Sequence, residues 1–115
     1  MSHEKAYLHD IIESFELASS YLGSQTMGEL AKDQQTLDAI IRRIEIVGEA
    51  TKRLADDFRK ANPHIPWREM AGMRDIMIHG YDRVDVIRVY TTVKERMPPM
   101  IDELKRLRDS LPDPD

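Results

Sequence analysis

The fold is decided by residues 33–60, which read DQQTLDAIIRRIEIVGEATKRLADDFRK. Leu, Ile, Val and Phe side chains recur there every three or four positions and form one apolar stripe, opposite a face of Arg, Lys, Glu and Asp. This spacing is that of an amphipathic α-helix with one buried face. The stretch therefore predicts one long helix, which Pro63 and Pro66 should end because a proline disfavours helix in the residue before it.

The same periodicity recurs in three further stretches, at residues 6–22, 67–79 and from about 85 to 111. Pro66 suits the first position of the third helix, and Gly80 suits the left-handed cap that would end it. Pro98 and Pro99 must kink or split the fourth helix. No segment alternates with period two over a useful length. We therefore expect an all-α protein, an up-and-down bundle of four to five helices with a short polar connector at residues 23–32.

Length and composition restrict the class of protein. A chain of 115 residues that is 41% hydrophobic and 33% charged can bury one core, so we expect a single domain over residues 1–111 and a frayed tail over residues 112–115. The chain has no cysteine, which excludes disulfides and thiolate metal sites. No apolar run approaches a membrane span and the charged start does not resemble a signal peptide, so we expect a cytoplasmic protein without membrane contact.

The charge balance restricts how nucleic acid could bind. The formal net charge of −4 disfavours a protein that binds phosphates with its whole surface. A nucleic-acid function would need a local positive patch. We expect Arg68, Arg74 and Arg83, drawn from two subunits, to form such a cleft and to bind the nucleic acid there.

Candidate chemistry is concentrated in residues 74–81, which read RDIMIHGY. The guanidinium of Arg74 offers a planar fork of donors that suits a phosphate. The imidazole of His79 can both accept and donate a proton near neutral pH. Structural interpretations remain open for each residue. Arg74 could form a salt bridge with Glu45 or Glu49, His79 could simply stabilise the end of a helix, and Tyr81 could be a packing residue.

Helical geometry separates Arg74 from His79. At about 100° per residue these two side chains lie about 140° apart on an unbroken helix. They can converge only if the helix breaks near Gly80, or if a second copy of the chain supplies a partner residue. We expect both, and therefore a two-fold homodimer.

The pattern Arg, four residues, His, one residue, Tyr resembles the motif of the HEPN superfamily, in particular its HepT-like toxins. The flanking sequence is similar as well, in residues 43–50 (RIEIVGEA), 65–67 (IPW), 90–93 (YTTV) and 97–100 (MPPM). The resemblance therefore covers nearly the whole chain.

This resemblance implies a homodimeric toxin with metal-independent endoribonuclease activity and no cofactor. It also implies a partner, a minimal nucleotidyltransferase antitoxin of the MntA type, which in some pairs transfers AMP to the motif tyrosine. Carried over to this sequence, Arg74 and His79 would be the catalytic pair, Asp75 would orient the site and Tyr81 would be modified. The expected substrate is RNA and not DNA.

A mechanism follows from these side chains. His79 would act as general base on a ribose 2′-hydroxyl or as acid toward the leaving 5′-oxygen, and Arg74 would stabilise charge on the phosphoryl oxygens. Two other interpretations stay open. The chain could be a catalytically silent HEPN-type module that binds a nucleotide or the nucleotidyltransferase, or a structural dimer in which Arg74 and His79 only stabilise the fold.

Overall fold

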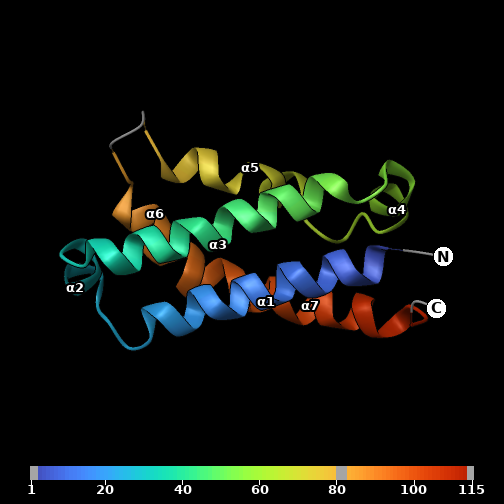
Figure 1. The fold of residues 1–115 in the computed structure, drawn as a ribbon, viewed down its shortest axis with the longest axis horizontal. Helices are drawn as coiled ribbons and strands as arrows, with labels where there is room; N and C mark the ends of the chain where they lie inside the picture. The colour runs from blue at the N-terminus through green and yellow to red at the C-terminus, as the bar shows by residue number, and fades with distance from the viewer. Residues whose placement is uncertain (1–2, 80–82, 114–115) are drawn as a thin grey trace.

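The computed structural model describes residues 3–79 and 83–113, so residues 114–115 of the expected tail lie outside it. The helices are α1 (Glu4–Leu22), α2 (Met27–Ala31), α3 (Gln34–Arg53), α4 (Asp56–Ala61), α5 (Trp67–Met77), α6 (Val86–Thr91) and α7 (Met97–Ser110), with a π-helical turn η1 (Thr92–Arg96) between the last two. The four long segments run alternately in opposite directions, as Figure 1 shows. The predicted all-α, up-and-down bundle is confirmed. None of the helices in the described ranges combines the length and apolarity needed to cross a bilayer.

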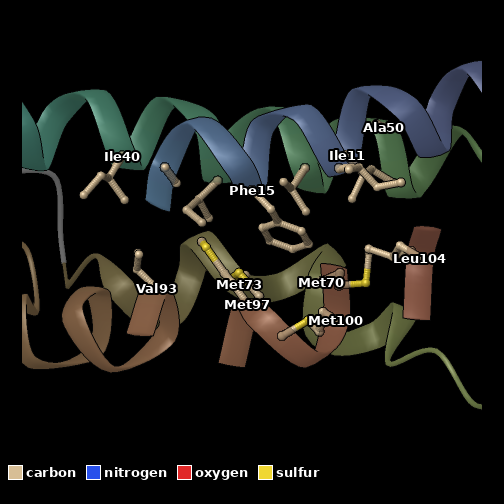
Figure 2. Close-up of a cluster of buried hydrophobic side chains, with 14 of the residues drawn as sticks. Ile11, Phe15, Ile40, Ala50, Met70, Met73, Val93, Met97, Met100 and Leu104 are labelled. Carbon is tan, nitrogen blue, oxygen red and sulfur yellow. The ribbon is translucent and has the colours of Figure 1, made fainter. Parts of the chain in front are cut away.

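The core lies between a layer formed by α1 and α3 and a layer formed by α5 and α7 (Figures 1 and 2). Phe15 of α1 is fully buried there, against the methionines of the opposite layer. These methionines are Met70, Met73, Met97 and Met100. Methionine is flexible enough to fill the irregular space between helices. Met70 and Met73 thus define the face of α5 that points into the core. The outer face of α5 is thereby left for the charged residues of the motif.

The single helix predicted for residues 33–60 is wrong beyond Arg53. Leu54 and Ala55 have extended backbones, and α4 begins only at Asp56. The break turns Leu54 into the core, where it is buried. It also places α4 over the start of α5, where the Trp67 indole N–H donates to the carbonyl of Arg59 at 3.1 Å and to that of Asn62 at 2.9 Å.

The connector predicted at residues 23–32 contains the short helix α2. Its start is a capping box in which the Glu29 amide donates to the Thr26 hydroxyl at 3.1 Å and the Thr26 amide donates to the Glu29 carboxylate at 2.9 Å. The spacing of these two residues, Thr-x-x-Glu, is a recognised signal for a helix start. The prediction of a plain polar connector missed it.

The expected interruption around Pro98 and Pro99 is confirmed and takes the form of η1. The Met97 amide donates to the carbonyl of Thr92, five residues back. This bond makes the turn directly before the prolines a wider, π-helical one. Both prolines then fall in the first turn of α7, where a missing amide proton costs little. Arg96 at the end of η1 binds both carboxylate oxygens of Glu69, at 2.9 and 2.5 Å, and so ties η1 to α5.

Candidate functional site

The end of α5 positions the motif. The helix stops at Met77, and Ile78 has an extended backbone that pairs with Val84 in an isolated antiparallel bridge. The His79 amide donates to the carbonyl of Arg83 and the Asp85 amide to that of Met77, both at 2.7 Å. The break expected near Gly80 therefore comes two residues earlier. Gly80 and Tyr81 lie outside the described residues.

His79 follows the helix instead of occupying its last turn, so the interpretation of His79 as a helix-end residue does not hold. Its Nε2 lies 3.3 Å from Oδ2 of Asp85, and its side chain is 61% exposed. Asp85 also caps α6, because its Oδ1 accepts from the Arg88 amide at 3.1 Å. That amide and the His79 ring together hold the pKa of Asp85 below its usual value.

Asp85 is a site residue that the sequence interpretation missed. The sequence held one signal for a structural role of Asp85, because an aspartate directly before a helical, periodic stretch is a preferred N-cap. The cap explains why Asp85 is fixed, and the chain reversal explains why its second oxygen reaches His79. The acid that orients the histidine thus comes from the next helix.

Arg74 lies in the last turn of α5 and contacts α3. Its Nε donates to Oε2 of Glu45 at 3.1 Å, and its guanidinium lies 3.8 Å from the carboxylate of Asp75. The salt bridge with Glu45 foreseen from the sequence is thus present. The two helices approach closely at Gly48, where an added Cβ would lie only 3.3 Å from the carbonyl oxygen of Ala71. Glycine at this position lets Glu45 reach Arg74.

Arg74 and Asp75 line a groove of ≈ 300 Å³ between α3 and α5. Its charged lining residues are Glu45, Glu49, Lys52, Arg74 and Asp75. Three carboxylates against two cations give this groove an acidic balance within one subunit. A phosphate that approaches Arg74 must therefore compete with carboxylates that are already there.

Arg68 and Arg83, the other cations singled out in the sequence, do not line this groove. Arg68 is exposed on α5, six residues before Arg74, and Arg83 is exposed directly before the bridge. Asp75 is 81% exposed, and its ion pair among the described residues is with Arg74. Within residues 3–79 and 83–113 no hydrogen bond or ion pair joins Arg74 to His79. Each instead has its own carboxylate partner.

Metal ligands are not grouped in the part of the chain that the structure describes. No set of three histidine, aspartate or glutamate side chains there is placed to hold a metal ion. The groups available for chemistry at the end of α5 are an imidazole, a guanidinium and carboxylates. Such a set can transfer protons and stabilise a phosphoryl group.

Comparison with known proteins agrees with the motif. The family model for HepT-like ribonucleases matches residues 11–107. The chain belongs to the HepT-like family. A relative in Thermococcus cleftensis, named "Probable ribonuclease HepT", is 43% identical over 90% of this chain and 94% of its own length. Another, named "Putative RNase MJ1380" in Methanocaldococcus jannaschii, is 37% identical over 88% of this chain and 93% of its own length. No solved structure matches this HepT-like chain.

Proposed function

We propose that this HepT-like protein is a metal-independent endoribonuclease that acts as the toxin of a toxin–antitoxin pair. One observation carries the proposal: a chain of this family presents Arg74 and His79, both exposed, at the end of α5. Ribonuclease is also the activity named for its relatives in Thermococcus cleftensis and Methanocaldococcus jannaschii. The substrate class follows as RNA, because the chemistry uses a ribose hydroxyl.

In the proposed reaction, His79 removes the proton of a 2′-hydroxyl, whose oxygen attacks the adjacent phosphorus while the 5′-oxygen leaves with a proton. Nε2 of His79 is hydrogen-bonded to Asp85, so Nδ1 is the ring nitrogen that accepts the proton from the substrate. Arg74 binds the non-bridging phosphoryl oxygens as charge develops on them, in exchange for Glu45. The products are a 2′,3′-cyclic phosphate and a free 5′-hydroxyl.

A second copy of the chain completes the site in this proposal. A single subunit offers one histidine at the motif, whereas the reaction needs both a base and an acid. Ile76 lies between Arg74 and His79 in the sequence and is 43% exposed, and Ile87 on α6 is 63% exposed. An exposed isoleucine in the middle of the motif supports a two-fold contact there, with Arg68, Arg74 and Arg83 of both subunits around the RNA.

Neutralisation by a minimal nucleotidyltransferase of the MntA type is the remaining part of the proposal. AMP on the Tyr81 hydroxyl would add a bulky anion to the motif, two residues after His79 in the sequence. That anion would repel RNA and block access. Mass spectrometry of the protein coexpressed with such a partner should find AMP on Tyr81, and AMP on another residue alone would contradict this switch.

The reaction itself can be tested with matched substrates. The protein should cleave a single-stranded RNA and leave the all-deoxy strand of the same sequence intact, and a chelator should have no effect. The 3′ end should carry a cyclic phosphate. Cleavage of the all-deoxy strand, or loss of activity in EDTA, would contradict the proposed chemistry.

One observation favours a second function, a catalytically silent module that binds a nucleotide or the nucleotidyltransferase. In the structure Arg74 is paired with Glu45, and His79 is paired with Asp85. Such pairs could serve only to stabilise a binding surface. A purified protein that binds its partner but leaves every RNA intact would support the binding module.

A further inference from the structure

A second groove, which we call the α4–α5 groove, lies where α4 packs against the start of α5. It has a volume of ≈ 520 Å³. Apart from the carboxylate of Asp56, its lining side chains are cationic or apolar. The cations are Arg59, Lys60 and Arg68, and the apolar residues include Ile65, Pro66 and Trp67.

The charge of this groove is opposite to that of the groove at Arg74. Among the described residues that line it, Asp56 is the one carboxylate, and it is paired with Arg59. Lys60 and Arg68 are exposed and have no carboxylate partner within residues 3–79 and 83–113. Nε of Arg59 is buried without an acceptor. A protein of net charge −4 thus gathers unneutralised cations at one place, which suits an anionic ligand.

The apolar residues indicate what kind of anion fits. Pro66 is partly exposed in the groove, beside the largely buried Ile65 and Trp67. The indole of Trp67 is held in place by its N–H bonds to the carbonyls of Arg59 and Asn62. A fixed apolar surface beside cations can bind a base and its phosphate at once, whereas a simple anion would use the cations alone.

The two grooves lie along the same helix, α5, and share a lining residue. Ala71 lines both of them, and the spacing of Trp67, Ala71 and Arg74 places these residues on one face of the helix. Arg68 and Arg74 are about 9 Å apart along the helix axis. A single strand whose reacting phosphate lies at Arg74 can therefore continue into the α4–α5 groove.

We propose that the α4–α5 groove binds the single-stranded RNA that flanks the phosphate to be cleaved. Lys60 and Arg68 contact its phosphates, and the apolar wall at Pro66 contacts a base. This inference rests on the proposed ribonuclease function and adds to it a substrate site outside the motif. It also extends the proposed positive patch of Arg68, Arg74 and Arg83 toward α4.

Trp67 provides a direct reporter, because it is the single tryptophan of the chain. We would titrate a single-stranded ten-nucleotide RNA of mixed sequence into the His79→Ala protein and check on a gel that the RNA stays intact. Occupation of the groove should give a saturable change in Trp67 fluorescence. The binding constant should agree with that from the anisotropy of a labelled RNA.

The decisive variant is Lys60→Gln combined with Arg68→Gln in the His79→Ala protein. Loss of two phosphate contacts should weaken RNA binding about tenfold. It should also reduce the dependence of log K on log salt by about 1.4, because each phosphate contact on a single strand contributes about 0.7. The matched control is Lys32→Gln with Arg106→Gln, which removes the same charge from the C-cap of α2 and from α7 and should change neither value.

The outcomes separate this inference from the proposed function. If the wild type cleaves RNA and the Lys60 and Arg68 variant keeps the RNA affinity and salt dependence of the His79→Ala protein, the groove does not bind RNA and the inference is overturned. If the wild type cleaves no RNA but the fluorescence and salt effects appear as stated, the inference stands and the ribonuclease proposal fails. If the variant loses only neutralisation by a protein partner, the groove is a protein-binding surface and the inference is again overturned.

Discussion

Glu45→Gln tests the idea that RNA must take Arg74 away from a carboxylate. Oε2 of Glu45 lies 3.1 Å from Nε of Arg74, and the side chains are 33% and 47% exposed. Glutamine keeps the size of the side chain and an oxygen that can accept from Arg74, but it removes the negative charge. The substitution therefore leaves Arg74 in position and removes the competitor of the phosphate.

The size of the effect follows from the exposure of the pair. An ion pair this exposed contributes about 0.2 to 1 kcal/mol. Its release should tighten RNA binding by about 1.4- to 5-fold, seen as a lower KM with kcat little changed. The control is Glu49→Gln, which removes the same charge from the same groove and whose described ion pair is with Arg42, not Arg74.

The assay is steady-state cleavage of a short fluorescent RNA by the wild type and both variants. A tenfold lower kcat in Glu45→Gln with an unchanged or higher KM would refute the reasoning. Glu45 would then be required to position Arg74 and would not compete with the substrate. An equal gain in both variants would mean that only the overall charge of the groove matters.

Four further predictions follow from the site and the helix that carries it. Asp85→Asn should lower kcat about ten- to a hundredfold at unchanged KM, because His79 loses its orienting acid; unchanged kcat would contradict this. Gly72→Ala should raise the free energy of unfolding in urea by about 0.8 to 1 kcal/mol, since the space around Gly72 is open; a decrease would show that the space is occupied. Ile76→Asp should convert the proposed dimer into a monomer in sedimentation velocity, and a dimer that persists would place the interface elsewhere. Hydrogen bonds from Thr36 and Gln25 hold the pKa of Asp33 below 3.8, and those from the Arg88 amide and the His79 ring do the same for Asp85. The stabilisation that these carboxylates contribute is therefore present above pH 3.8 and is lost as pH falls through their lower folded pKa values. The urea midpoint should fall over that range, and a midpoint that stays constant would contradict this.

The sequence predicted the bundle because its apolar periodicity is strong and local. The end of α3 was not predicted, because neither Leu54 nor Ala55 is a glycine or a proline that would mark a break. The break depends on burial of Leu54 and on the hydrogen bonds from Trp67 to α4, both of which are tertiary contacts. Local propensity cannot report contacts of this kind.

The site was predicted in part for the same reason. Glu45 could be named as a partner of Arg74, because each lies on the charged face of a strongly periodic helix. Asp85 was missed, because it reaches His79 only through a chain reversal. Arg59 and Lys60 looked like the solvated end of one long helix. Only the break before α4 brings them beside Arg68 to form the α4–α5 groove.

The central claim is that Arg74 and His79 form the catalytic pair of a ribonuclease. The most direct test measures RNA cleavage and growth arrest for the wild type, Arg74→Ala and His79→Ala, with folding of all three checked by circular dichroism. If the claim is right, the wild type cleaves RNA and arrests growth, and both folded variants lose both effects. Full activity in either folded variant, or an inactive wild type, would contradict it.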